Sequence, residues 1–136
     1  SSEFTQPKPV EDAEKKIFKV LLVEDNEMNR QVISISTKRF GHEVDYAADG
    51  RDAVDMFMKG NYDIVLMDIH MPDMDGIEAT KIIRKFEKDN RPGTRAKIVA
   101  ITADSTQENR ENCLLAGMDD YFAKPVRVKD LEKIYT

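Results

Sequence analysis

The segment Tyr62–Asp68, with the sequence YDIVLMD, constrains the fold more than any other part of the chain. Five of its seven residues are apolar, and the apolar run ends abruptly in the carboxylate of Asp68. A continuous apolar run of this length predicts a strand that is covered on both faces, as in a parallel sheet. Asp68 would then lie where this strand leaves the core, at the carboxyl end of the sheet.

Apolar runs and helical patterns alternate along the rest of the chain. Strands are predicted at residues 18–23, 43–47, 62–68, 96–101 and 119–123, and helices at residues 26–41, 50–59, 77–87, 107–116 and 127–135. Strands that alternate with helices indicate a parallel sheet with helices on both faces, and right-handed crossovers make it doubly wound. We therefore predict a flavodoxin-like α/β fold with five parallel strands in the order 2-1-3-4-5.

Apolar spacing predicts which helix faces point inward. On the first helix Met28, Val32 and Ile35 recur at helical spacing, with Ile33 and Phe40 beside them. On the second helix Val54, Phe57 and Met58 form the expected inner face. A charged loop is expected over residues 88–95.

The fourth helix differs, because residues 104–112 contain no apolar side chain. Helices in proteins are stabilised mainly by packing an apolar face. We therefore predict that its first turns are weakly docked.

Length and charge exclude several classes of function. The chain has 136 residues and a net charge of −5, which indicates one domain and argues against a nucleic-acid or anionic-membrane surface. Its single cysteine, Cys113, excludes an internal disulfide and favours a reducing, cytoplasmic location. Residues 1–16 are predicted to be a flexible linker or cloning remnant. Residues 17–136 form the domain, with a last helix that the end of the chain could cut short.

Polar side chains follow four of the predicted strands. Glu24 and Asp25 follow the first strand, Asp68 ends the third, Thr102 follows the fourth and Lys124 the fifth. In a parallel sheet these ends lie on one edge, and the first and third strands are neighbours. The three carboxylates are therefore expected to crowd together.

Three carboxylates in one crevice repel each other unless a cation lies among them. Oxygen ligands at this charge density suit Mg²⁺, with Mn²⁺ as an alternative. Thr102 offers a hydroxyl and Lys124 a positive charge to phosphate oxygens. The set is complete for phosphoryl transfer to Asp68 as an aspartyl-phosphate.

These motifs together resemble the receiver domain of two-component response regulators, most closely the receivers of hybrid sensor histidine kinases. The resemblance rests on residues 23–26 (VEDN), 67–76 (MDIHMPDMDG) and 116–121 (AGMDDY), with Thr102 and Lys124-Pro125. It covers residues 19–135, and its joint pattern is far more specific than any single motif.

The resemblance implies that Asp68 accepts phosphate from a phosphohistidine. The donor would be a histidine kinase dimerisation domain or a histidine phosphotransfer protein, and the phosphoryl group could be relayed onward. Asp25, Asp68 and the backbone carbonyl of His70 would hold Mg²⁺, with Glu24 acting directly or through water. Many members of the family have Asp at the position of Glu24.

The resemblance also implies a conformational switch. Thr102 would move toward the phosphate, and Tyr121 would turn inward with it. The Lys124-Pro125 bond is cis in most members of the family. Such a domain would catalyse its own phosphorylation and dephosphorylation. Its parent chain could be a membrane-anchored hybrid kinase, although this domain itself is expected to contact no membrane.

Several alternative functions share parts of this pattern. A stand-alone regulator acting by protein contact has the same motifs. A haloacid-dehalogenase-like phosphatase needs a second Asp at position 70, where this chain has His70. An FMN-binding flavodoxin would be repelled by the acidic residues after the first strand. In the simplest structural interpretation, Glu24 and Asp25 only cap the first helix, and Thr102 only ends a strand.

Overall fold

The computed structural model describes residues 16–136, so the predicted linker lies outside the described residues apart from Lys16. Five parallel strands form one sheet in the order β2-β1-β3-β4-β5, as predicted. The strands are β1 (Lys19–Val23), β2 (Glu43–Ala47), β3 (Ile64–Asp68), β4 (Lys97–Thr102) and β5 (Asp120–Ala123). The helices are α2 (Glu27–Arg39), α3 (Gly50–Lys59), α4 (Gly76–Asn90), α5 (Gln107–Ala116) and α6 (Val128–Ile134).

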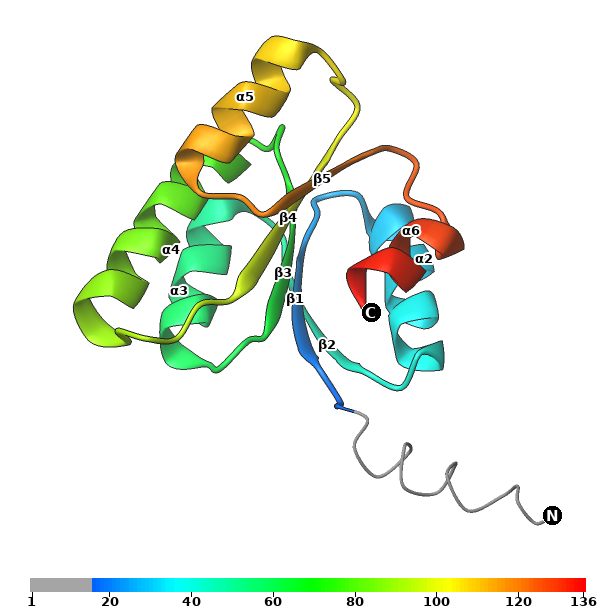
Figure 1. Ribbon diagram of the computed structural model, residues 1–136. Coiled ribbons are helices and arrows are strands. Elements are labelled where there is room, and N and C mark those ends of the chain that lie inside the picture. The colour runs from blue at the N-terminus through cyan, green and yellow to red at the C-terminus, as the bar shows by residue number, and fades with distance from the viewer. Residues whose placement is uncertain (1–15) are drawn as a thin grey trace, which may run out of the picture.

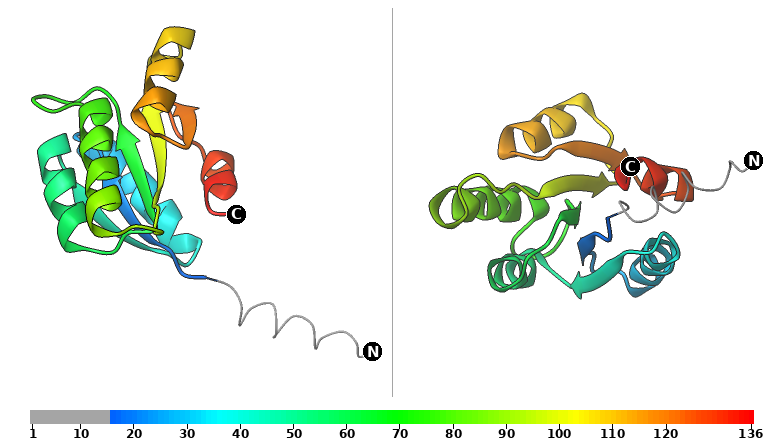
Figure 2. Two further views of the ribbon diagram at one scale, coloured as in Figure 1. Left: turned by 60° about the vertical axis from the view of Figure 1, so that its left-hand side comes forward. Right: turned by 60° about the horizontal axis from the view of Figure 1, so that its bottom comes forward.

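Helices cover both faces of the sheet, which gives the molecule two apolar cores (Figures 1 and 2). Helices α3, α4 and α5 pack on one face, and α2 and α6 pack on the other. Strand β3 contributes to both cores, because Val65 and Met67 face the first and Ile64 and Leu66 the second. All five residues of β3 are buried, which confirms the two-sided burial predicted from its apolar run.

The apolar pattern on α2 identifies its buried face only in part, because Ile33 is buried and Phe40 packs against the same core but the other three apolar residues do not. The three apolar residues expected to face the core have relative exposures of 74%, 55% and 54%, for Met28, Val32 and Ile35 respectively. The buried positions are Ile33, Ser34 and Thr37. The Ser34 hydroxyl lies 2.9 Å from the Tyr46 hydroxyl, and that of Thr37 lies 2.6 Å from the Tyr135 hydroxyl. These hydrogen bonds offset the cost of burying the polar side chains of Ser34 and Thr37. The helix packs through that face, so the exposed stripe formed by Met28, Val32 and Ile35 stays at the surface.

Two smaller expectations are also corrected. On α3 the predicted Phe57 is buried and Val54 packs against the core, but Met58 is 38% exposed and Ala53 is buried in addition. Helix α4 runs three residues into the predicted loop and ends at Asn90. Its C-cap, Arg91, precedes Pro92, and the residue before a proline disfavours helical backbone.

None of the helices within residues 16–136 combines the length and the apolar character that crossing a bilayer requires.

A charged network fastens α4 to the start of β4 and the end of α5. Asp119 accepts hydrogen bonds at 2.7 Å from both Arg84 and Arg95 and at 2.9 Å from the Ile98 amide. Burial alone would raise the pKa of Asp119, but these hydrogen bonds and the two guanidinium charges hold its pKa below its ordinary value.

The network yields a prediction about stability and pH. We expect Asp119→Asn to lower the free energy of unfolding at pH 7 by about 1–3 kcal/mol. A depressed carboxyl pKa stabilises the fold above the unfolded-state pKa, so the difference should shrink as pH falls below about 4. Urea titrations at several pH values measure this. The exposed Asp89, which pairs with Lys85, is the control, and Asp89→Asn should cost less than about 1 kcal/mol.

Helix α5 yields a prediction about dynamics. Asn109 is the one buried residue between positions 103 and 112. We therefore expect the amides of residues 110–112 to exchange with deuterium at least about tenfold faster than residues 79–81, which occupy the same helical positions in α4. Hydrogen exchange followed by NMR measures both sets, and equal rates would contradict weak docking.

Candidate functional site

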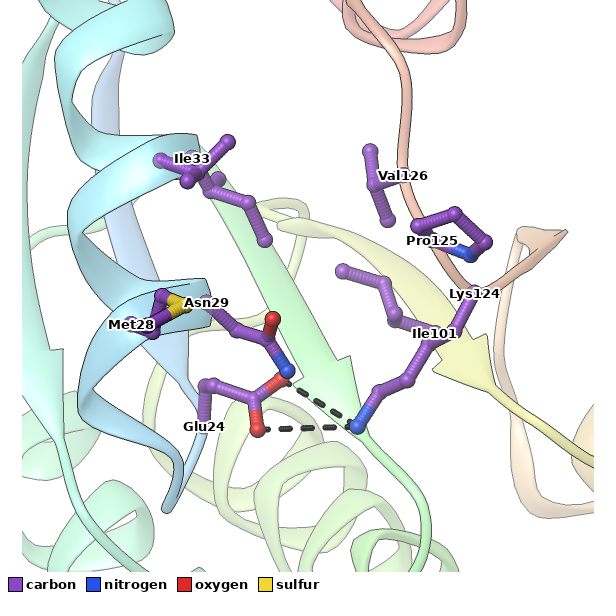
Figure 3. A pocket seen from close by; sticks show the side chains of 9 residues that line it. Glu24, Met28, Asn29, Ile33, Ile101, Lys124, Pro125 and Val126 are labelled. Carbon is purple, nitrogen blue, oxygen red and sulfur yellow. Dashed lines mark hydrogen bonds and ion pairs between the residues drawn. The ribbon is translucent and has the colours of Figure 1, made fainter.

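The carboxyl ends of the strands bring together side chains that are far apart in the sequence. Glu24 follows β1 and Lys124 follows β5. The Lys124 ammonium lies 3.3 Å from Glu24 Oε1 and 3.5 Å from Glu24 Oε2 (Figure 3). It also donates a hydrogen bond of 2.9 Å to Asp68 Oδ2, at the end of β3. One ammonium therefore bridges two carboxylates that are themselves almost fully buried.

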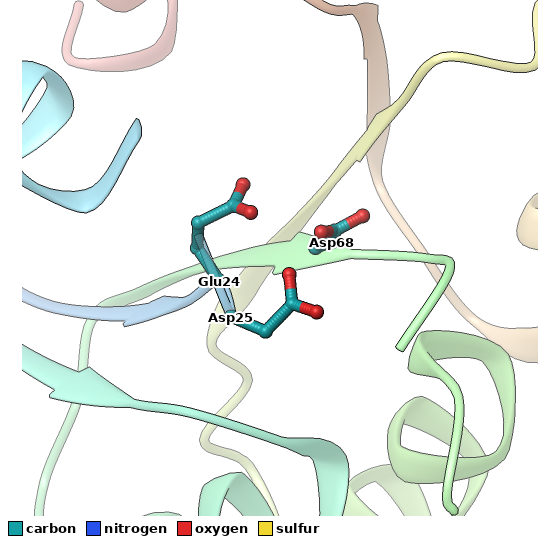
Figure 4. A group of neighbouring side chains, drawn as sticks. All are labelled: Glu24, Asp25 and Asp68. Carbon is teal, nitrogen blue, oxygen red and sulfur yellow. The ribbon is translucent and has the colours of Figure 1, made fainter. Parts of the chain in front are cut away.

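Three carboxylates converge at this edge of the sheet. Each of Glu24, Asp25 and Asp68 contributes an oxygen that lies within 4.8 Å of the others (Figure 4). The pairing of Val23 with Met67 across β1 and β3 places these residues side by side. Asp25 is exposed, so solvent reaches the group from that side.

The turn after β1 holds the acidic pair away from a helix-capping role. The N-cap of α2 is Asn26, whose side chain accepts a 2.9 Å hydrogen bond from the Asn29 amide. Arg30 donates to the backbone carbonyl of Glu24 at 3.0 Å and to that of Asp25 at 3.4 Å. The interpretation of Glu24 and Asp25 as simple N-caps is therefore wrong.

The electrostatics of the three converging carboxylates favour a bound cation. Burial, followed by the negative charge of Asp68, raises the pKa of Glu24. Burial acts to lower the pKa of Lys124, but its hydrogen bond to Asp68 and the charges of Asp68 and Glu24 outweigh this and raise it. Glu24 Oε1 is buried and forms an ion pair with the Lys124 ammonium at 3.3 Å, but it makes no hydrogen bond within the described part of the chain. Such an oxygen beside two further carboxylates fits the ligand set of a hard divalent cation.

A close backbone approach shapes the loop that carries Asp68. Gly76 opens α4, and its amide donates to the carbonyl of Ile69 at 3.0 Å. A Cβ at this position would lie 2.5 Å from the Asp68 carbonyl oxygen, so only glycine fits without movement of the loop. The close approach of Gly76 to Asp68 could not be predicted from the sequence.

Thr102 lies at the same edge but faces the turn that follows β4. It is fully buried, and its Oγ1 accepts a 3.0 Å hydrogen bond from the Asp104 amide. Its carbonyl accepts a 2.9 Å hydrogen bond from the Lys124 amide, which ties the end of β4 to the lysine. The Lys124–Pro125 peptide bond is cis.

Tyr121 and His70 flank the site. The Tyr121 hydroxyl donates a hydrogen bond to the Asp104 carbonyl. The His70 side chain is exposed, and its amide lies 3.3 Å from Asp68 Oδ1. Asn109, which the sequence did not single out, lies beside Tyr121 with its side-chain nitrogen 3.4 Å from the tyrosine hydroxyl.

An apolar groove of about 430 Å³ adjoins the three carboxylates, and no pattern in the sequence indicated it. Its walls come from α2 and from the segment after β5 (Figure 3). Besides Glu24 and Lys124 it is lined by Met28, Asn29, Val32, Ile33, Ile101, Pro125 and Val126. Two exposed apolar residues of α2, Met28 and Val32, therefore line the same groove as the lysine that holds Asp68.

Proteins of known family resemble this chain in sequence. The family model described as the response regulator receiver domain matches residues 20–136. The chain is 42% identical over 123 residues to hybrid signal transduction histidine kinase B of Dictyostelium discoideum, covering 85% of this chain and 6% of the relative. It is 39% identical over 142 residues to probable histidine kinase 1 of Oryza sativa subsp. indica, covering 85% of this chain and 15% of the relative.

Solved structures show the same fold. One is the receiver domain of sensor histidine kinase PA1611 from Pseudomonas aeruginosa PAO1, with a magnesium ion coordinated in its active site cleft. It has a TM-score of 0.77 and 42% identity, over 88% of this chain and 95% of that one. Another is a Saccharomyces cerevisiae co-crystal of the histidine phosphotransfer signalling protein Ypd1 with the receiver domain of its downstream response regulator Ssk1. Its TM-score is 0.80 with 35% identity, over 89% of this chain and 90% of that one.

Proposed function

Since the chain belongs to the response regulator receiver domain family, we propose that Asp68 is its phosphoacceptor and takes a phosphoryl group from a phosphohistidine. The observation that carries this assignment is the position of the Asp68 carboxylate. It is 2% exposed, it is held at 2.9 Å by the Lys124 ammonium, and it lies within 4.8 Å of two further carboxylates. Among the described residues, no other group of acidic, histidine or cysteine side chains with this spacing was found.

The transfer needs no general base. An Asp68 oxygen attacks the phosphorus, the bond between phosphorus and the imidazole nitrogen breaks, and its electron pair stays on the imidazole. The product is a mixed anhydride between the Asp68 carboxyl group and phosphate. Lys124 is placed to hold a phosphoryl oxygen as negative charge shifts, and the Thr102 hydroxyl is the donor available on the neighbouring strand.

Glu24, Asp25 and Asp68, with the backbone carbonyl of His70, would hold Mg²⁺. The Glu24 oxygen that lacks a hydrogen bond and the solvent-exposed Asp25 fit an ion that keeps some of its waters. The magnesium ion in the Pseudomonas receiver supports this choice of metal. Bound there, Mg²⁺ would neutralise charge on the phosphoryl oxygens.

The partner that fits this site is a histidine phosphotransfer domain, and we propose that it docks on the apolar groove. The donor histidine has to reach Asp68 through the open edge of the sheet. The groove runs from α2 to that edge and shares Glu24 and Lys124 with the site. The yeast co-crystal with Ypd1 and the hybrid-kinase relatives support a partner of this kind and a place in a phosphorelay.

Labelling by a small phosphodonor tests the phosphoacceptor. With acetyl phosphate and Mg²⁺, we expect intact-protein mass spectrometry to show one phosphoryl adduct on the parent and none on Asp68→Asn. Removal of Mg²⁺ with a chelator should abolish labelling of the parent. Asp63→Asn is the control, because Asp63 is a carboxylate just before the opposite end of the same strand. Equal labelling of the parent and Asp68→Asn would contradict the assignment.

A charge placed in the groove tests the docking surface. We expect Val32→Asp to slow transfer from phosphorylated Ypd1 by at least about tenfold, because a central interface contact contributes about 2 kcal/mol or more. Labelling by acetyl phosphate should be unchanged, since that donor needs no docking.

Leu115→Asp is the matched control for the groove variant. Leu115 is 85% exposed on α5, away from the groove, so its replacement should affect neither reaction. If Val32→Asp accepts phosphate from Ypd1 as fast as the parent, the groove is not the docking surface.

A further inference from the structure

Asn109 is placed to connect the phosphorylation site with helix α5. It is 9% exposed, whereas every other residue of α5 up to Asn112 is exposed. Its side-chain nitrogen donates a 2.9 Å hydrogen bond to the Asp104 carbonyl and lies 3.4 Å from the Tyr121 hydroxyl. Asn109 is therefore the one side chain that the first turns of α5 bury against the rest of the domain.

The backbone of Asp104 lies between Asn109 and Thr102. Its amide donates to the Thr102 hydroxyl at 3.0 Å. Its carbonyl accepts hydrogen bonds from both Tyr121 and Asn109. A chain of hydrogen bonds therefore connects the Thr102 hydroxyl, through the backbone of Asp104, to the Tyr121 side chain and to helix α5.

A threonine hydroxyl can donate one hydrogen bond and accept two. Thr102 can therefore donate to a phosphoryl oxygen on Asp68 and still accept from the Asp104 amide. If the Thr102 hydroxyl moved toward the phosphate, the backbone of residue 104 would move with it. Tyr121 and Asn109, which donate to the Asp104 carbonyl, would then follow. Tyr121 passes this movement to β5, and Asn109 passes it to α5.

Among the side chains near the start of α5, that of Asn109 is best placed to transmit this movement to the helix. The N-cap is Thr106, whose hydroxyl accepts from the Asn109 amide at 3.2 Å, so the helix begins without help from the Asn109 side chain. Arg110 points its guanidinium at the Tyr121 ring, 5.4 Å from its centroid, and is itself exposed.

We propose that Asn109 is a positioning residue that couples the Thr102 hydroxyl to helix α5, through its hydrogen bond to the Asp104 carbonyl. The proposal rests on the assignment of Asp68 as phosphoacceptor. It adds that the conformational signal leaves the site by two routes, the Tyr121 ring and the Asn109 amide. A surface formed by α5 would then report phosphorylation to a partner.

The test compares chemistry at Asp68 with the response of α5. Beryllofluoride with Mg²⁺ serves as the phosphoryl mimic, and amide NMR shifts of residues 107–116 report the helix. We expect Asn109→Ala to keep its rate of labelling by acetyl phosphate within about twofold of the parent. The equilibrium constant for the α5 response should fall by about fivefold, the factor that one hydrogen bond contributes. Asn112→Ala, an exposed asparagine of the same helix, should respond like the parent.

A second variant separates hydrogen bonding from packing. Asn109→Asp keeps the size of the side chain, and a negative charge in the first turn of a helix favours the helix, so α5 should remain formed. It lacks the amide donors, so we expect the same loss of response as in Asn109→Ala.

The outcomes separate the two proposals. A parent protein that is not labelled overturns the proposed function and the coupling with it. A labelled parent whose α5 response is retained in either Asn109 variant overturns the role of the Asn109 hydrogen bond and leaves the phosphoacceptor assignment intact.

Discussion

The balance of charge around Lys124 determines what the edge of the sheet can bind. Lys124 lies within 3.5 Å of two buried carboxylates, Glu24 and Asp68, and Asp25 adds a third negative group nearby. A single ammonium cannot neutralise three carboxylates, and burial makes the excess charge costly. The raised pKa of Glu24 expresses that cost. A divalent cation supplies positive charge that offsets the carboxylates and a phosphoryl group. The excess of negative charge therefore suits a site where the cation and the phosphoryl group bind together.

The doubly wound sheet makes this balance possible. Parallel strands deliver their last residues to one edge, so Lys124 meets Glu24 across one hundred positions of sequence. The apolar run that ends at Asp68 was enough to predict a central strand buried on both faces. Polar residues at the ends of four strands were then enough to predict the acidic group and its lysine, because the order of strands makes β1 and β3 neighbours.

Features that depend on distant partners could not be predicted. The inner face of α2 contains Ser34 and Thr37, which are stabilised by the hydroxyls of Tyr46 and Tyr135. Periodicity counts apolar residues and does not detect such pairs, so the exposed stripe was assigned to the core. Asn109 escaped notice for the same reason. Each of these polar side chains is buried because it hydrogen-bonds to another residue: Ser34 to Tyr46, Thr37 to Tyr135, and Asn109 to the Asp104 carbonyl.

The central claim is that the carboxylate of Asp68 itself forms the bond to phosphorus. Borohydride reduction tests this directly, because it converts an aspartyl-phosphate to homoserine, which peptide mass spectrometry can locate. After labelling with acetyl phosphate and Mg²⁺, the account predicts homoserine at position 68 and at no other acidic residue. Homoserine at another position, or a phosphoryl group that survives on a serine, threonine or histidine, would contradict it.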